Sequence, residues 1–197
     1  MAGLLDLGDL ISPKSSLLIG LPARVNANRN AAGSHVRPRD GVELLEAAEA
    51  ADFAAARALF EEYAAELKID LCFQGFAAEL AQLEDHYGPP TGCLLLARRG
   101  AIPLGCGALR RLSGDTCEMK RLYVRAEARG AALGRDIANC LVARARALGY
   151  ARMVLDTLAG MIPARNLYRS LGFYEIAAYY RNPSPDALYM ELDLRID

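Results

Sequence analysis

The segment from Thr116 to Leu148 most constrains the fold, because a strand pattern there leads through a glycine-containing turn into the most regular helical pattern of the chain. We expect a strand over Thr116–Val124, followed by the turn Arg-Gly-Ala-Ala-Leu-Gly-Arg at 129–135. Gly149 is placed to cap the helix that follows. One face of that helix carries the apolar residues Leu133, Ile137, Leu141, Ala145 and Leu148.

A helix that begins in this way is suited to bind a phosphate or a diphosphate. Its first main-chain N–H groups have no partner within the helix, and the positive end of the helix dipole lies at the same place. Arg129 and Arg135 would add charge-assisted hydrogen bonds. The alternative is a plain helix start in which Gly130 and Gly134 only ease packing. The turn lacks the Gly-Lys-Ser/Thr ending of a nucleotide-hydrolysing P-loop, and its glycine spacing does not match a dinucleotide fingerprint.

The rest of the chain mixes helical and strand patterns in an order that predicts an α+β (mixed α/β) domain and not a doubly wound parallel sheet. A helix over 49–67 is indicated by the apolar stripe Phe53, Ala56, Phe60, Tyr63 and Leu67. The other expected elements are a strand at Val42–Ala47, a weaker helix at Phe73–Leu83, strands at Cys93–Arg98 and Ile102–Arg111, a strand at Met153–Thr157, a helix at Pro163–Leu171, and strands at Phe173–Ala177 and Leu188–Leu194.

Residues 1–40 show no sustained period and are expected to form a weakly ordered N-terminal extension of a domain that covers 41–197. Asp6 and Asp9 argue against a secretory signal in this extension. No apolar run has the length of a membrane span, so no membrane partner is expected. The chain has 23 Lys and Arg against 24 Asp and Glu, and this balance argues against nucleic-acid binding.

The cysteines and histidines point to an intracellular protein without a metal. Five cysteines with no Cys-x-x-Cys spacing are expected to be small buried hydrophobes in a reducing compartment, which favours the cytoplasm. His35 and His86 are the two histidines, and they stand far apart with no cysteine close by. We therefore expect no metal site.

A second motif follows the strand at Met153–Thr157, where residues 167–173 read Leu-Tyr-Arg-Ser-Leu-Gly-Phe. With the turn at 129–134, which fits an Arg/Gln-x-x-Gly-x-Gly/Ala motif with one substitution, the chain resembles the GCN5-related N-acetyltransferases (GNAT family). The resemblance runs from about Val42 to Leu194. It implies a GNAT-like acyl-CoA N-acyltransferase fold, with a central, mostly antiparallel twisted sheet of six to seven strands flanked by about four helices.

The resemblance also implies which residues bind coenzyme A. In the family, the strand before the turn pairs through its backbone with the pantetheine arm, a role that falls here on Leu122, Tyr123 and Val124. The diphosphate would be held by Arg129, Gly130, Ala131, Ala132, Leu133, Gly134 and Arg135. Two departures stand out. Ala132 replaces the inner glycine of the motif, which would cost roughly 1–2 kcal/mol in a left-handed conformation. Met161 occupies a position where the family often has a coenzyme-contacting asparagine.

Catalytic roles follow from the same resemblance. Tyr168 is implied to give a proton to the departing thiolate of the coenzyme, and a tyrosine that only packs on the core is the alternative. The attacking amine must be neutral, whereas a lysine-like amine has a pKa of roughly 10.4, so a carboxylate base is needed. Glu118 stands where the histone-acetylating branch carries its glutamate base; alternatively it pairs with Lys120 or Arg121. A main-chain N–H group at 122 or 123 would meet the oxyanion.

The acceptor amine leaves little trace in the sequence. Tyr179, Tyr180 and Asn182 would line an acceptor pocket, or else they stiffen an exposed turn beside two prolines. In the same way, the acidic side chains of a helical region would attract a cationic amine or merely form a polar helix face. These acidic residues are Glu79, Glu84 and Asp85.

Together these features predict an N-acyltransferase that moves an acetyl group from acetyl-CoA to a primary amine of a small-molecule or protein acceptor. The amine would attack directly in a ternary complex. Two alternatives stay open at this point: a non-catalytic, regulatory module that binds coenzyme A, and a structural domain that forms a homodimer.

Overall fold

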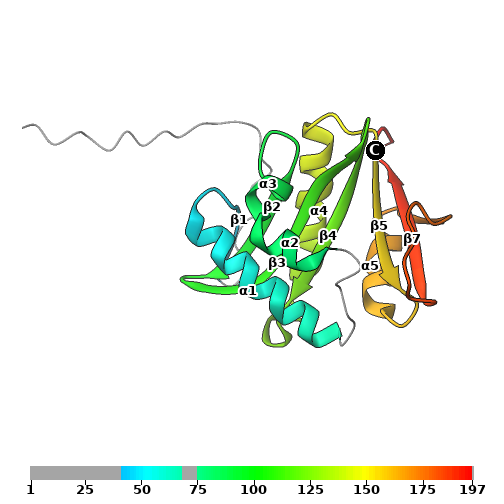
Figure 1. The fold of residues 1–197 in the computed structure, drawn as a ribbon. Helices are drawn as coiled ribbons and strands as arrows, with labels where there is room; N and C mark the ends of the chain where they lie inside the picture. The colour runs from blue at the N-terminus through cyan, green and yellow to red at the C-terminus, as the bar shows by residue number, and fades with distance from the viewer. Residues whose placement is uncertain (1–40, 68–74, 197) are drawn as a thin grey trace, which may run out of the picture. The chain divides into compact units, whose positions relative to one another are not determined.

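The computed structural model describes residues 41–67 and 75–196, which form a seven-stranded sheet covered by helices (Figure 1). The strands lie in the spatial order β1-β2-β3-β4-β5-β7-β6. Their bounds are β1 (Val42–Glu46), β2 (Cys93–Arg99), β3 (Ile102–Ser113), β4 (Thr116–Val124), β5 (Arg152–Leu158), β6 (Tyr174–Ile176) and β7 (Ala187–Asp193). The helices are α1 (Ala50–Leu67), α2 (Phe76–Ala81), α3 (Leu83–Tyr87), α4 (Leu133–Ala147) and α5 (Ile162–Ser170). The expected extension at 1–40 lies outside the described residues.

This architecture confirms the mixed α+β fold and the expected strands, whose ends differ from the expectation by one or two residues. The helix expected at Phe73–Leu83 is different. The first residues of this expected range lie outside the described residues. The rest forms two short helices, α2 and α3, that are separated at Gln82. Gln82 has φ −133° and ψ 43°, and its N–H bonds the Glu79 carbonyl, so the helical ladder is interrupted. The break allows both Leu83 and Tyr87 to be buried.

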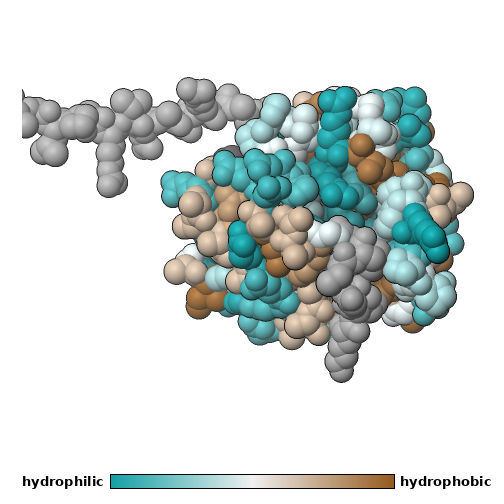
Figure 2. Space-filling model, in the orientation of Figure 1, coloured by the Kyte–Doolittle hydropathy of each residue, from teal (hydrophilic) through white to brown (hydrophobic). Residues whose placement is uncertain are grey.

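The sheet is the middle layer between two groups of helices, as the alternating side chains of β2 show. Cys93 and Leu95 point into a core that includes residues of α4 and α5. Leu94 and Leu96 point into a second core formed with α1 and α3. At the surface, hydrophilic and hydrophobic residues of the described ranges are interspersed on the face shown in Figure 2. Within the described ranges, the large apolar side chains are thus mostly buried, in two cores on the two faces of the sheet.

One junction of the sheet is parallel and short. Strands β4 and β5 pair only over Thr116–Glu118 and Arg152–Val154 in the described chain, while the other strand neighbours are antiparallel. β4 continues to Val124 and β5 to Leu158, so the two strands diverge beyond this seam. The divergence leaves one edge of β4 without a strand partner among the described residues, inside the sheet itself.

A β-bulge distorts β4 just beyond the seam. Lys120 is opposite Ala108 of β3 and Tyr123 is opposite Cys106, so Arg121 and Leu122 together face the single residue between them on β3. Arg121 has φ 57°, a left-handed conformation that costs a residue with a side chain roughly 1–2 kcal/mol. The surrounding structure must therefore hold this conformation in place.

Three of the four described cysteines are buried, as the sequence predicts. Cys93, Cys106 and Cys117 are buried free thiols and Cys140 is half-buried, whereas Cys72 lies outside the described residues. Burial raises the pKa of the Cys93 and Cys117 thiols to about 12, so they stay protonated at neutral pH. Within 41–67 and 75–196, no helix is long and apolar enough to cross a membrane.

Candidate active site

A groove of about 430 Å³ runs along the unpaired edge of β4. Three of its lining residues, Leu122, Tyr123 and Val124, are those expected to pair with the pantetheine arm. The last turns of α1 contribute Tyr63 to one wall, and Met161 closes the other side. The position where the family often has an asparagine therefore does face the groove, although methionine offers no amide there.

A smaller cavity of about 60 Å³ adjoins the groove where β4 and β5 diverge. The two spaces share four lining residues, which are Tyr63, Leu67, Leu122 and Met161. The cavity adds polar and charged groups from β4, β5 and the loop before β7: Lys120, Arg121, Asp156, Thr157, Asn182 and Ser184. Tyr168 of α5 also lines it. An extended molecule in the groove would therefore present its end to a polar chamber.

The turn before α4 exposes main-chain donors. Gly130 has φ 87° and Ala132 has φ 62° and ψ 8°, so Ala132 adopts the left-handed conformation in which its side chain is costly. The N–H groups of Arg135 and Asp136 both bond the Ala132 carbonyl. The N–H groups of 130–134 have no main-chain acceptor among the described residues. The sequence predicts N–H donors from Gly130 to Arg135 for a diphosphate, and of these the Arg135 N–H is already used within the turn. Only Arg129 of the turn lines the groove.

Arg129 is held against the wall of the groove. Its guanidinium makes two hydrogen bonds to the Glu66 carboxylate, at 2.6 and 2.8 Å, and a third of 2.8 Å to the Val124 carbonyl. It also lies 5.8 Å from the centre of the Tyr123 ring. The hydrogen bonds from Arg129 hold the pKa of Glu66 below its ordinary value. The Arg129 cation is thus held on the wall of the groove, between α1 and the end of β4.

Tyr168, the residue that the family resemblance implies as proton donor, lines the cavity where β4 and β5 diverge. Only 8% of the residue is exposed, and its ring packs 5.8 Å from that of Phe173. Burial raises the pKa of Tyr168 well above the ordinary value of a tyrosine, so its hydroxyl keeps its proton at neutral pH. The structure gives the hydroxyl no hydrogen-bond partner within the described residues. A phenol in this setting can donate its proton to a group that enters the cavity.

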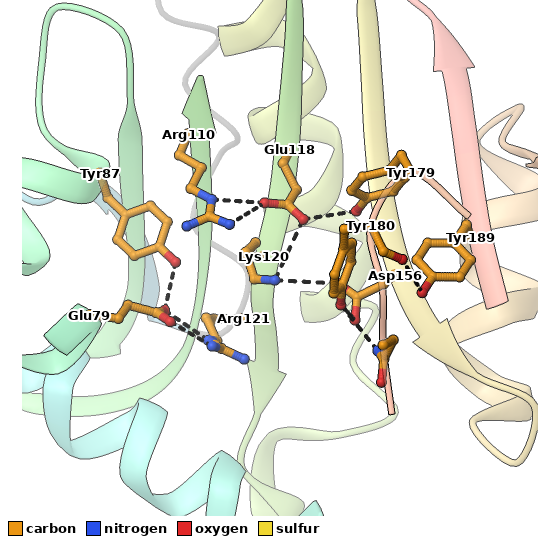
Figure 3. A network of polar contacts seen from close by, with 11 residues as sticks. Glu79, Tyr87, Arg110, Glu118, Lys120, Arg121, Asp156, Tyr179, Tyr180 and Tyr189 are labelled. Atoms are coloured by element: carbon orange, nitrogen blue, oxygen red, sulfur yellow. Dashed lines mark hydrogen bonds and ion pairs between the residues drawn. The ribbon is translucent and has the colours of Figure 1, made fainter. Parts of the chain in front are cut away.

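Glu118 lies deep in a polar network, shown in Figure 3, and is not among the residues that line the cavity. It is 1% exposed. Arg110 donates to one carboxylate oxygen at 2.8 Å, and the Tyr179 hydroxyl donates to the other at 2.8 Å. Lys120 Nζ is 3.5 Å away, which matches the pairing that the sequence left open, whereas Arg121 pairs elsewhere. The carboxylate is thus surrounded by partners of this chain.

Asp156 is the site residue that sequence reasoning missed. It lies on β5, lines the same cavity as Tyr168, and accepts hydrogen bonds from Lys120 Nζ at 3.3 Å and from the Tyr180 hydroxyl at 2.9 Å. In the sequence it stands in the apolar run Met-Val-Leu-Asp-Thr of a buried strand. A lone acidic residue in a buried strand needs polar partners or has a function, so its presence in this apolar run is the sequence signal that points to Asp156.

The expected acceptor residues divide into two groups. Asn182 lines the cavity, and its amide donates to the Tyr180 hydroxyl at 3.1 Å. Tyr179 and Tyr180 instead bond carboxylates of β4 and β5, and their rings pack on each other and on Tyr189 with centres 5.2 to 5.5 Å apart. The acidic residues divide too. Glu79 is buried against Arg121 and is not offered to an acceptor, whereas Glu84 and Asp85 are exposed.

Comparison with known proteins identifies this arrangement. Residues 53–173 match the Acetyltransferase (GNAT) family, a range that includes the turn before α4 and Tyr168. An N-acetyltransferase of Schizosaccharomyces pombe, itself uncharacterized, is 45% identical over 138 residues, or 69% of this chain and 85% of the relative. The IAA acetyltransferase of Azospirillum brasilense is 34% identical over 51% of this chain and 67% of its own.

Solved structures share the fold. An acetyltransferase of Streptococcus agalactiae superposes with a TM-score of 0.67 at 24% identity, over 79% of this chain and 99% of that chain. The Salmonella typhimurium protein yncA, solved with its cofactor acetyl-CoA, superposes with a TM-score of 0.55 at 21% identity, over 79% of this chain and 95% of that one. From the family match and the relatives together, the chain belongs to the acetyltransferase (GNAT) family and is an acyl-CoA-dependent N-acetyltransferase.

Proposed function

We propose that the protein transfers an acetyl group from acetyl-CoA to a primary amine of a small-molecule or protein acceptor, by direct attack in a ternary complex. The observation that carries this proposal is the junction of the two spaces at Leu122 and Met161. A coenzyme arm in the groove would bring its thioester to that junction. An amine in the cavity would then meet the thioester beside Tyr168 and Asp156.

The coenzyme half of the proposal rests on main-chain groups. Beyond the seam with β5, the edge of β4 at 122–124 has no strand partner in the described chain, so its N–H and carbonyl groups are open to the pantetheine amides. The N–H groups of 130–134 would hold the diphosphate at the positive end of α4. Arg129 would add its charge at the wall of the groove.

The chemistry needs a proton donor for the sulfur and donors for the oxyanion. The amine nitrogen forms a bond to the acetyl carbon, and the carbonyl oxygen becomes an oxyanion that an N–H group at 122 or 123 would stabilise. When the carbon–sulfur bond breaks, the Tyr168 hydroxyl protonates the departing thiolate. The raised pKa of Tyr168 means that its hydroxyl carries the proton at neutral pH, so the proton is available when the sulfur departs.

We assign the general base to Asp156 and not to Glu118. Asp156 lines the cavity with Tyr168, whereas Glu118 is covered by Arg110 and Tyr179 and is not part of the cavity wall. Asp156 would accept the proton of the attacking amine, directly or through a water molecule. Glu118 then holds Lys120, whose ammonium lies 3.5 Å from Glu118 and 3.3 Å from Asp156.

Two relatives favour a small acceptor. One is named IAA acetyltransferase, and another, the N-acetylaspartate synthetase of Homo sapiens, is 30% identical over 102 residues, which is 34% of that protein. The cavity volume of about 60 Å³ also favours a small polar group over a bulky one. Aspartate and other small amines are therefore the first acceptors to test, followed by peptides with a free lysine or N-terminus.

The test is a thermal shift with acetyl-CoA followed by a screen of amines that detects free thiol. Stabilisation by acetyl-CoA, with thiol released in the presence of one amine and not without it, supports the enzyme. Stabilisation without thiol release on any amine supports a coenzyme-binding module. No stabilisation by acetyl-CoA contradicts the assignment of the groove.

A further inference from the structure

Arg121, the residue of β4 with a left-handed backbone conformation, forms a buried ion pair with Glu79. Arg121 has φ 57° at the bulge and is 6% exposed. Its guanidinium donates two hydrogen bonds to Glu79, Nε to Oε1 at 2.8 Å and Nη2 to Oε2 at 2.6 Å. Glu79 is 3% exposed and lies on α2, a helix on the opposite side of the bulge from β5. The pair thus joins a short helix to the strained point of the strand.

Further contacts restrain the same pair. The Tyr87 hydroxyl, from α3, donates a hydrogen bond of 2.6 Å to Oε1 of Glu79. The Phe76 ring lies beneath the guanidinium, with its centre 5.0 Å from the central carbon of Arg121. Burial alone would raise the pKa of Glu79, but the hydrogen bonds and charge of Arg121 bring it below the ordinary value. The carboxylate is therefore charged, and both of its oxygens are directed at fixed partners.

Stability alone is a poor reason for such a pair, because apolar residues of similar volume are often as stabilising as a buried ion pair. What an ion pair adds is direction, since a bidentate guanidinium accepts one orientation of the carboxylate. Here the oriented residue is Arg121, which immediately precedes Leu122. The next three residues of β4 line the groove, and their main-chain groups are the ones proposed to meet the coenzyme.

We propose that Glu79 is a positioning residue: acting through Arg121, it fixes the bulge of β4 so that the main chain of 122–124 faces the coenzyme arm. This inference rests on the proposed function. Glu79 does not line either space and touches no substrate; its effect passes through Arg121. The short helices α2 and α3 thereby become the support of the coenzyme-binding strand.

The test compares Glu79→Gln with a control that weakens the core elsewhere. Leu94→Ala truncates a buried residue of β2 that lines neither space and makes no hydrogen bond to Glu79 or Arg121. Acetyl-CoA affinity is measured by calorimetry at a temperature where circular dichroism shows both variants folded. We expect Glu79→Gln to weaken acetyl-CoA binding about tenfold or more, because a buried cation loses its partner, while Leu94→Ala changes it less than about twofold.

Amide chemical shifts supply a readout that does not depend on binding. In Glu79→Gln the N–H resonances of Leu122 and Tyr123 should move, and in Leu94→Ala they should stay in place. Should Glu79→Gln fail to fold, Tyr87→Phe removes one hydrogen bond to the carboxylate and leaves the ion pair; we expect a smaller loss of affinity in the same direction. Equal affinity and unmoved resonances in the Glu79 or Tyr87 variant would overturn the inference. A wild-type protein that binds no acetyl-CoA would instead overturn the proposed function.

Discussion

The hydroxyl of Tyr180 donates a hydrogen bond of 2.9 Å to Asp156 and so ties the loop before β7 to the carboxylate that lines the cavity. The direction of this bond is set by Asn182, whose amide donates to the same hydroxyl oxygen at 3.1 Å. The Tyr180 proton is therefore directed at Asp156. Lys120 approaches the other carboxylate oxygen, and the side chain is held from two sides.

Replacing Tyr180 by Phe should lower kcat several-fold and leave the KM for acetyl-CoA nearly unchanged. The reason is that the variant frees the Asp156 carboxylate without altering the groove. Steady-state kinetics with a fixed acceptor measures both constants. Tyr174→Phe is the matched control, because it removes a hydroxyl that bonds Glu191 at 2.6 Å on β7, away from the cavity. A loss of the same size in both variants would contradict the role given to Tyr180.

Asp156→Asn should reduce turnover at least about a hundredfold and keep coenzyme affinity, because the amide cannot accept the amine proton. Glu118→Gln should act mainly on stability, lowering the free energy of unfolding by about 3 kcal/mol, since Arg110 loses its charged partner. Thiol release and urea unfolding measure the two effects. If Glu118→Gln proves stable and inactive while Asp156→Asn keeps its turnover, the base is Glu118.

Tyr168→Phe should lower kcat far more than it lowers coenzyme affinity, with a loss of about a hundredfold or more. Its pH dependence has a definite sign. The pKa of Tyr168 is raised, so the proton-bearing form persists below that raised value, and turnover should not fall through loss of this proton up to about pH 10. A pH–rate profile of the wild type checks this. Equal losses of affinity and turnover in Tyr168→Phe would mean that the residue only shapes the pocket.

Gly134→Glu should abolish measurable coenzyme binding, because it places bulk and negative charge where the diphosphate is proposed to lie. The protein should remain folded, since an acidic residue in the first turn of a helix is favourable to the helix dipole. Gly134→Ala is the control: a Cβ there would lie 3.7 Å from Val124, an ordinary contact, and binding should persist. Calorimetry with acetyl-CoA separates the two. Unchanged binding by the Glu variant would remove the turn from the site.

The stability of the Glu79–Arg121 pair should depend on pH in one direction. The pKa of Glu79 is lowered from 4.5 in the folded protein, so its stabilising contribution is complete above about pH 4.5 and is lost as the pH falls through the folded value. The difference in free energy of unfolding between wild type and Glu79→Gln should therefore shrink between pH 6 and pH 3. A difference that stays constant over this range would show that folding does not lower the pKa of Glu79.

Periodicity predicted the parts of the fold that depend on one-sided burial. The face of α4 with Ile137 and Leu141 is buried as expected, and Gly149 closes the helix with φ 82°. The break at Gln82 was not predictable, because it depends on burying Tyr87 against residues remote in sequence. The bulge at Arg121 was hidden for the same reason, since its partner Glu79 lies 42 residues earlier in the chain.

Candidate site residues that stand in a local sequence motif could be named from the sequence. Contacts between segments far apart in the sequence could not. The turn at 129–135 and Tyr168 stand in local patterns, whereas the surroundings of Glu118 come from Arg110 and, 61 residues later, Tyr179. The sequence alone could not weigh Glu118 against Asp156. Their difference is a matter of which carboxylate faces empty space, and that is set by the divergence of two strands.

The seam of three residue pairs between β4 and β5 has a consequence for how this protein can change over evolutionary time. Beyond the seam, the edge of β4 without a strand partner presents main-chain N–H and carbonyl groups, which are the same for almost every amino acid. Substitutions at residues 122–124 are therefore compatible with the proposed binding of the coenzyme through the main chain. If the acceptor binds in the cavity as proposed, changes at Asn182 and Ser184, which line it, can alter acceptor preference without changing the edge of β4.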